Sequence, residues 1–195
     1  MDSFFWSLRG VKKGVFLMWI KYLLLLGMAT CSIYACAHGV KQIAAPPKVV
    51  PYVDLKRYIG TWYEIARFTH RFEKGCFASS ATYTLLDNGQ IEVVNQCRKG
   101  SLDGKISSVK GKGWVVDKET NAKLKVSFFW PFAGDYWIID LGKDYEYAVV
   151  SNPDRKYLWI LSRTPEMDEK LYTRIVEDLS KDGYEVGKLE KTGQP

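Results

Sequence analysis

Two residues far apart in the chain, Trp62 and Arg163, have side chains that stabilise each other when they meet. Trp62 lies near the start of the strand-like run 60–67, and Arg163 ends the strand-like run 159–163. If the sheet closes on itself, its first and last strands become neighbours, and the guanidinium can cover the indole. Such a cation–π contact contributes roughly 0.5–2 kcal/mol. We therefore predict that this pair plugs one end of a barrel, a shape that favours ligand binding over catalysis.

Residue types that support catalysis are sparse. The chain has two histidines, His38 and His70, and no G-x-S-x-G, H-E-x-x-H or phosphate-loop motif. Glu64 stands nearly alone as a carboxylate expected to face inward. Because a buried carboxylate needs a partner, it either receives the polar end of a ligand or makes an internal hydrogen bond to a tyrosine or Arg163. We predict a protein that is not an enzyme and that uses no metal or cofactor.

The elements that must position these residues are short strands. Eight strand-like runs alternate with turn signals such as Asp87-Asn88-Gly89, which is typical of an up-and-down barrel or a sandwich. The link 70–75 is longer than the other connections, and we expect a flexible lid there, across an open rim. The runs are 61–68, 77–85, 91–98, 105–116, 123–129, 136–141, 145–151 and 157–162.

A helix follows the strands. We expect it to open at Thr164, since Pro165 and the acidic residues after it suit a first helical turn. Apolar residues recur at helical spacing through 171–179, and Gly183 is a natural stop. This single apolar stripe predicts packing on the outer wall of the sheet. Residues 184–189 could add a short edge strand.

The first 35 residues read as a targeting segment that starts at either Met1 or Met18. Its basic residues account for about half of the chain's net charge of +6, and an apolar run follows at 22–29. That run is shorter than the ~20 residues of a membrane span, so a signal peptide is favoured over a transmembrane anchor. The positive charge left on the rest of the chain is too weak to indicate nucleic-acid binding.

A lipid-attachment signal ends this segment. Ile33-Tyr34-Ala35-Cys36 resembles a bacterial lipobox, and Cys31 is the less fitting alternative. We predict a signal peptide over 1–35, a lipid-modified Cys36, and a tether over 36–52 that contains two prolines. Neither cysteine is followed by aspartate, so the resemblance implies retention at the outer membrane. Several acyl chains on one cysteine would hold the protein firmly there.

The two remaining cysteines, Cys76 and Cys97, read as a disulfide because the chain is exported. They flank a strong hairpin turn signal and so lie on adjacent strands. A simple two-residue turn does not bring them opposite each other, so a bulge or a longer loop is required. The alternative is two reduced cysteines on the wall of the sheet.

Four ordered blocks of the sequence resemble the lipocalins, and within them the branch of bacterial lipocalins related to apolipoprotein D. The blocks are 60–67, 71–74, 122–132 and 153–165. The family's middle motif, usually Thr-Asp-Tyr, is present only in part as Lys143-Asp144-Tyr145. The resemblance implies an all-β fold, an eight-stranded antiparallel barrel over 53–190 with a C-terminal helix outside it and a short tail over 191–195. It also implies a cavity for small hydrophobic ligands, with lysophospholipids and fatty acids favoured.

Strand alternation gives the residues expected to line that cavity. If Trp62 points inward, every second residue of each strand does too. The expected ligand contacts are Glu64, Ala66, Phe68, Ala81, Tyr83, Val93, Val126, Phe128, Tyr136, Tyr147 and Trp159. The set is mostly apolar and aromatic, which suits an acyl chain with a polar end. An eight-stranded barrel is barely wide enough to hold a ligand, so simple filling of the interior remains the alternative for each residue.

Other functions stay open. A tetrapyrrole carrier would use His70 as an axial ligand, and a structural envelope lipoprotein would have a filled interior. Aromatic and basic residues near the rim, including Phe129, Trp130 and Phe132, either touch the bilayer or form a hydrophobic lid. The expected partners are a lysophospholipid or fatty acid and the membrane, with a homodimer possible.

Overall fold

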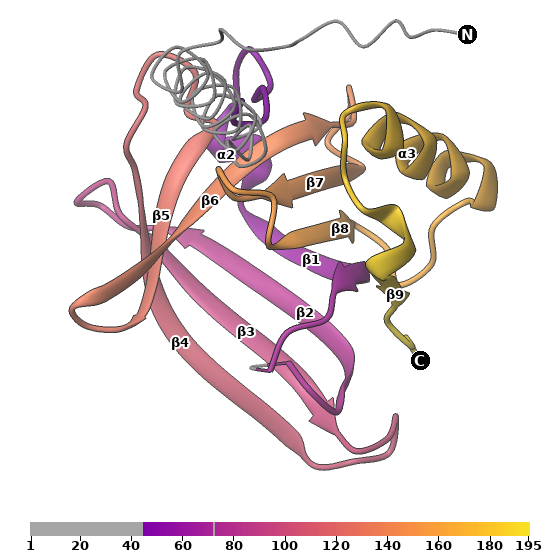
Figure 1. The fold of residues 1–195 in the computed structure, drawn as a ribbon. Helices are drawn as coiled ribbons and strands as arrows, with labels where there is room; N and C mark the ends of the chain where they lie inside the picture. Colours follow the sequence, from indigo (N-terminus) through magenta and orange to yellow (C-terminus); the bar gives the residue numbers. More distant parts are fainter. Residues whose placement is uncertain (1–44, 72) are drawn as a thin grey trace, which may run out of the picture. The chain divides into compact units, whose positions relative to one another are not determined.

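The structure is a computed structural model that describes residues 45–71 and 73–195. The predicted signal peptide and Cys36 lie outside these residues. No helix among the described residues is long and apolar enough to cross a membrane. The elements shown in Figure 1 are α2 (Leu55–Tyr58), β1 (Gly60–Phe68), β2 (Cys76–Leu85), β3 (Ile91–Lys99), β4 (Ile106–Val115), β5 (Lys123–Phe129), β6 (Phe132–Leu141), β7 (Tyr147–Ser151), β8 (Leu158–Ser162), α3 (Glu169–Lys181), a 3-10 turn (Val186–Lys188) and β9 (Leu189–Lys191).

Strands β1 to β8 form a closed barrel. Strands β2 to β8 pair in sequence order, all antiparallel, and β1 pairs with both β8 and β2. The predicted turn after β2 places Gly89 at a φ of 78°, a left-handed conformation that glycine adopts without steric cost. The prediction of an eight-stranded antiparallel barrel is confirmed. Strand β9 is an addition that pairs with β1.

The two ends of the barrel differ in what closes them. Because all neighbouring strands are antiparallel, successive connections alternate between the two ends. One end holds α2, Trp62 and Arg163, and we call it the plugged end. The opposite end, which we call the rim, is formed by the connections 69–75, 100–105, 130–131 and 152–157.

Helix α3 packs outside the barrel beside β7 and β8 (Figure 1). Its buried residues Ile175 and Leu179 form one apolar cluster with Ile160 of β8. Asp168 caps the helix by accepting a 2.9 Å hydrogen bond from the Leu171 amide, so the helix begins at 169 and not at 164. The short edge strand also lies later than expected, at 189–191, because a 3-10 turn occupies 186–188.

Irregular strands overturn part of the predicted lining. The pairing of β1 with β8 shifts between Glu64 and Ala66, and such a bulge reverses the faces of the residues that follow. Ala66 and Phe68 therefore belong to the outer cluster with α3. Tyr147 also faces α3: Val150 pairs with the inward Ile138, so alternation along β7 turns Tyr147 outward, and its hydroxyl accepts a 3.1 Å hydrogen bond from Arg174. The predicted placement of Ala66, Phe68 and Tyr147 in the lumen is wrong.

Ordered packing extends past both boundaries predicted for the barrel, 53 and 190. Pro47 is buried, and the Val50 amide donates a 3.1 Å hydrogen bond to the carbonyl of Ile138. At the other end, Lys191 belongs to β9 and the amide of Thr192 donates to the carbonyl of Ile65. The last part of the predicted tether and most of the predicted tail thus pack against the barrel.

Candidate functional site: the barrel lumen

The plugged end is closed by the predicted pair. The guanidinium carbon of Arg163 lies 3.8 Å from the centre of the Trp62 ring. Trp62 is fully buried, and its indole Nε1 donates a 2.8 Å hydrogen bond to the carbonyl of Tyr58. Since Tyr58 ends α2, this bond makes the short helix part of the plug.

Arg163 also joins several backbone segments at the plugged end. Its nitrogens donate hydrogen bonds to the carbonyls of Arg57 (2.7 Å), Thr61 (3.0 Å), Tyr58 (3.1 Å) and Tyr145 (3.3 Å). Gly60 adopts a φ of 97°, and a Cβ atom at this position would lie 3.2 Å from an Arg163 nitrogen. The left-handed backbone favours glycine at this position, and the guanidinium leaves little room for a side chain there.

Three tyrosine hydroxyls form a cluster on the lumen side of the plug. The Tyr136 oxygen accepts a 3.0 Å hydrogen bond from Tyr83 and lies 2.7 Å from the Tyr58 oxygen. Burial raises the pKa of Tyr83 to about 12 and the pKa values of Tyr58 and Tyr136 well above the ordinary range, so all three remain protonated. Their two mutual hydrogen bonds use two protons, which leaves one to donate elsewhere. The cavity beside them measures about 10 Å³, roughly the size of one water molecule.

The burial of the lumen wall differs between the floor, which is the part of the lumen next to the plugged end, and the rim. The inward residues near the floor are buried: Tyr83, Ile91, Val93, Leu124 and Leu161. Other inward residues of the same apolar cluster remain partly exposed: Ala81, Val126, Phe128, Tyr136 and Trp159. Inward residues are thus buried next to the plugged end, and the partly exposed Phe128 and Trp159 lie toward the rim.

A buried charge cluster lies on β1 toward the rim. Glu64 forms an ion pair with Arg67 and accepts a hydrogen bond from the Thr192 hydroxyl. Burial raises the pKa of Glu64 to about 7; the Glu73 carboxylate adds to this increase, and Arg67 opposes it. The internal partner of Glu64 is thus Arg67 with Thr192, in place of the tyrosine or Arg163 considered from the sequence.

Glu73 fastens the link 69–75 to the barrel. Its carboxylate accepts a 3.3 Å hydrogen bond from the Trp159 indole and lies 3.2 Å from His70 Nε2. Burial by itself would raise the pKa of Glu73, but the contacts with His70, Arg67 and Trp159 outweigh it and lower the pKa. The His70 ring also packs edge-on against Tyr157 and Trp159. The residue considered as an axial ligand is therefore engaged in this network.

Cys76 and Cys97 form the predicted disulfide, with their Cα atoms 5.4 Å apart. The required bulge is present, because the pairing of β2 with β3 shifts between Phe77 and Ser80. The bridge ties the rim ends of these two strands together. Arg67 donates a 3.4 Å hydrogen bond to the Cys76 carbonyl, which links the bridge to the charge cluster.

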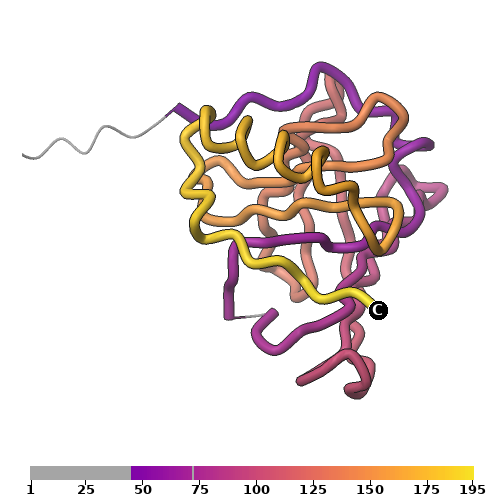
Figure 2. The backbone as a smooth tube through the Cα atoms, turned by 90° about the vertical axis from the view of Figure 1, so that its right-hand side faces the viewer, coloured from indigo at the N-terminus to yellow at the C-terminus, as the bar shows by residue number. Residues whose placement is uncertain are grey.

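The C-terminal segment fills the seam between β1 and β2 near the rim (Figure 2). Direct pairing of β1 with β2 covers only residues 60–63 of β1, and β9 takes over at 66–68. Beyond β9, the Gly193 carbonyl accepts a 2.7 Å hydrogen bond from Ala78, and the Gln194 side chain donates to the carbonyls of Glu64 and Ser79. The segment supplies the hydrogen bonds that the diverging strands lose.

A larger hollow of about 250 Å³ lies outside the barrel, where α3 begins. Half of its lining is polar or charged: Glu166, Glu169, Lys191 and Thr192. Lys191 pairs with Glu169 at 2.9 Å and lies over the ring of Tyr172. This hollow lacks the continuous apolar wall that an acyl chain requires.

The geometry agrees with known proteins. A family model described as a lipocalin-like domain matches residues 53–194. The chain belongs to the lipocalin family. This lipocalin is 45% identical over 153 residues to the outer membrane lipoprotein Blc of Citrobacter freundii, an alignment that covers 77% of this chain and 86% of the relative. It is 37% identical over 159 residues to mouse apolipoprotein D, with 76% and 80% covered.

A solved structure supports the same fold. Insecticyanin from the tobacco hornworm Manduca sexta matches with a TM-score of 0.61 at 20% identity, covering 77% of this lipocalin and 86% of that chain. At this identity the likeness concerns the fold alone. Binding of small hydrophobic ligands is the general role of the lipocalin family to which this chain belongs.

The structure brings eight of the eleven predicted ligand contacts to the lumen side of the barrel: Glu64, Ala81, Tyr83, Val93, Val126, Phe128, Tyr136 and Trp159. Their contact with a ligand stays a prediction. Sequence reasoning missed Arg67, Glu73 and Thr192, which surround Glu64. The short spacing between Glu64 and Arg67 could have indicated an ion pair, but plain alternation assigns those two residues to opposite faces of the strand.

Proposed function

We propose that this lipocalin binds amphiphiles with a single acyl chain, such as lysophospholipids and fatty acids, in the barrel lumen. The observation that carries the proposal is the wall above the floor, where apolar and aromatic side chains face inward and remain partly exposed. Hydrocarbon that covers this wall removes it from water, at about 25 cal/mol per Å² of apolar area. An eight-stranded barrel has room for one small ligand, which favours a single chain over two.

The ends of the lumen suggest how such a ligand lies. The floor is apolar and dry apart from the tyrosine hydroxyls, so the hydrocarbon enters first and points toward the plug. The polar end stays near the rim, where water reaches the lumen.

We further propose that the protein acts at a bacterial outer membrane, held by a lipid on Cys36. Support comes from the lipobox-like run 33–36 and from relatives, 45% identical in the case of Citrobacter freundii, that are outer membrane lipoproteins by name. The protein would store, scavenge or shuttle amphiphiles there without turning them over.

A pair of tryptophan substitutions on one strand tests the lumen as the binding site. Ala81→Trp fills the space between β2 and the opposite wall, whereas Thr84→Trp adds the same side chain on the exposed face of β2. We expect displacement of a fluorescent fatty acid by lysophospholipid in the parent protein and in Thr84→Trp, and at least about tenfold weaker binding in Ala81→Trp. Equal binding by both variants would exclude the lumen. Native mass spectrometry of copurified lipid would then identify the natural ligand.

A further inference from the structure

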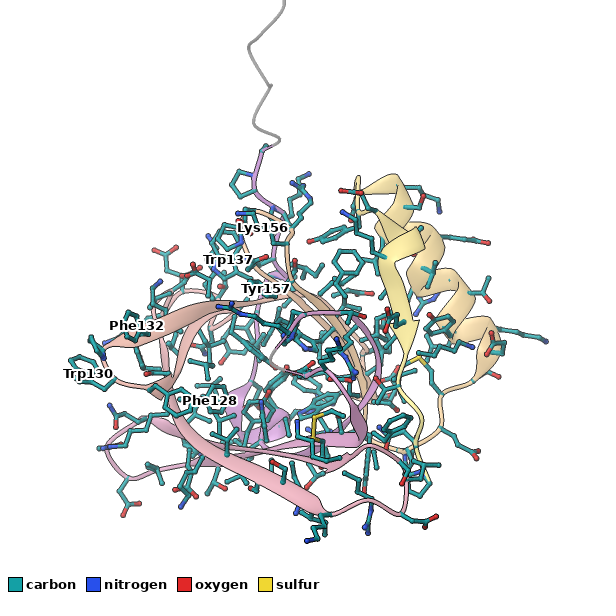
Figure 3. The ribbon with its side chains drawn as sticks, turned by 60° about the horizontal axis from the view of Figure 1, so that its bottom comes forward. Phe128, Trp130, Phe132, Trp137, Lys156 and Tyr157 are labelled. Atoms are coloured by element: carbon teal, nitrogen blue, oxygen red, sulfur yellow. A yellow bond between two sulfur atoms is a disulfide. The ribbon has the colours of Figure 1, made fainter. Side chains whose placement is uncertain are left out.

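An aromatic patch projects from the rim at the β5–β6 hairpin. Phe129, Trp130 and Phe132 are 72%, 85% and 78% exposed, more than any other large apolar side chain in the described part of the chain. Trp130 and Phe132 lie at the tip and point away from the barrel, whereas Phe128 lies back toward it and packs with the lumen residues (Figure 3). Adjacent aromatic side chains in water are unfavourable, so the patch indicates a contact surface.

The chain that leads to Cys36 meets the domain at the same end. Arg155, in the rim connection 152–157, donates a 2.7 Å hydrogen bond to the carbonyl of Ala45. That connection can be found in Figure 3 by its labelled residues Lys156 and Tyr157. Ala45 lies nine positions after Cys36, and even a fully extended segment of that length spans only about 30 Å. An anchor on Cys36 therefore keeps the rim close to the bilayer.

The two ends of the barrel carry net charges of opposite sign, positive at the rim and negative at the plugged end. The rim connections hold five basic and three acidic residues: Arg71, Lys74, Lys105, Arg155 and Lys156 against Glu73, Asp103 and Asp154. The segments 54–59, 86–90, 116–122, 142–146 and 163–168 at the plugged end hold five basic and eight acidic residues. An anionic lipid surface attracts the rim and repels the plugged end.

We propose that Phe129, Trp130 and Phe132 form a membrane-docking surface that inserts among the headgroups of an anionic phospholipid leaflet. Aromatic rings are favoured at that depth of a bilayer, and the net positive charge of the rim adds attraction. The lumen then opens toward the membrane, so an amphiphile passes between the leaflet and the barrel without crossing water. A second copy of the chain could also cover the patch, but two basic rims would repel each other. This inference goes beyond ligand binding because it assigns a partner to an outer surface.

Vesicle binding tests the surface without the anchor. The chain from residue 37 onward lacks both lipidation candidates, Cys31 and Cys36, and the predicted signal peptide with its apolar run 22–29, so its co-sedimentation with vesicles of phosphatidylglycerol and phosphatidylcholine in equal amounts reports docking by the folded domain. We expect the further changes Phe129→Ser, Trp130→Ser and Phe132→Ser to reduce the partition coefficient at least about tenfold. The matched control, Tyr52→Ser with Val116→Ser, removes exposed apolar side chains (59% and 49%) at the plugged end and should leave partitioning unchanged.

Two further measurements make the outcome decisive. Fatty-acid binding in solution should be equal in the patch variant and its control, so a loss of vesicle binding is distinct from a loss of the lumen or of the fold. Sedimentation velocity should show no dependence of the oligomeric state on the patch. The proposal is overturned if the patch variant binds vesicles as well as its parent, or if the patch mediates self-association and not vesicle binding.

Discussion

The plugged end and the rim of this barrel are stabilised by different kinds of contact. At the plugged end, one guanidinium covers the Trp62 indole and binds four backbone carbonyls. At the rim, a buried ion-pair cluster, a disulfide and the C-terminal segment hold strands that no longer pair directly. From this difference we expect the contacts at the rim, unlike those at the plugged end, to respond to pH, to reduction and to loss of a few residues.

This contrast explains how one small barrel remains folded and still admits a ligand. One apolar cluster fills the barrel next to the plugged end and a second packs α3 on the outer wall, so the rim tolerates partly exposed aromatic side chains such as Trp159. Polar contacts at the rim replace the strand pairing that a wider mouth cannot keep. Substitutions at the two ends should therefore affect different properties.

The largest expected effect is at the floor. Trp62→Ala removes a fully buried indole together with its contacts to Arg163 and Tyr58, and we expect the free energy of unfolding to fall by about 3–5 kcal/mol. Urea denaturation measures this change. Trp159→Ala, which removes a partly exposed indole from the lumen near the rim, should cost less than half as much but weaken fatty-acid binding more. Equal destabilisation by the two variants would contradict the difference in packing between the plugged end and the rim.

An intermediate effect is expected from the C-terminal segment. Deletion of residues 192–195 keeps β9 but removes the hydrogen bonds to Ile65, Ala78, Ser79 and Glu64. We expect unfolding to become easier by about 2 kcal/mol and a bound fluorescent fatty acid to leave faster in stopped-flow exchange, because the seam opens. Deletion of Pro195 alone is the control and should change neither quantity. Unaltered exchange in the longer deletion would mean that the segment does not close the seam.

The smallest expected effect is a pH dependence set at the rim. The pKa of Glu64 is about 7 in the folded protein, against about 4.3 in an unfolded chain. The folded state therefore binds more protons between these values, and the resulting stability, on the order of 1–2 kcal/mol, is complete below about pH 4.3 and lost as the pH rises through 7.

Glu64→Gln should flatten this part of the stability curve, as measured by urea denaturation between pH 4.5 and 7.5 (about the span of the two pKa values). The exposed Glu177→Gln variant of α3 serves as control and should retain the slope of the parent protein. A parent protein whose stability rises across this range would show that Glu64 stays ionised beside Arg67.

Several features of the fold follow from local sequence. The Asn88-Gly89 turn, the short runs between turns and the apolar stripe of α3 predicted an antiparallel barrel or sandwich and its outer helix, because each depends on residues close in the chain. The start of α3 was misplaced, since both Pro165 and Asp168 suit a helix N-terminus and only tertiary packing selects one. Bulges limited the lumen prediction in β1, because no local signal marks the extra residue that turns Ala66 outward.

The sequence by itself determined the antiparallel strands and the outer helix, because strand periodicity and turn chemistry depend on neighbouring positions. The lipocalin motifs added the closed barrel, and residue types added the Trp62–Arg163 plug and the disulfide. Tertiary structure alone decided which side chains face the lumen after each bulge. It also decided that Arg67 and Thr192 surround Glu64 and that the chain's last residues close the seam. The contacts of Glu64 with Thr192 and Gln194 join residues more than a hundred positions apart, and their geometry is fixed only when the sheet closes.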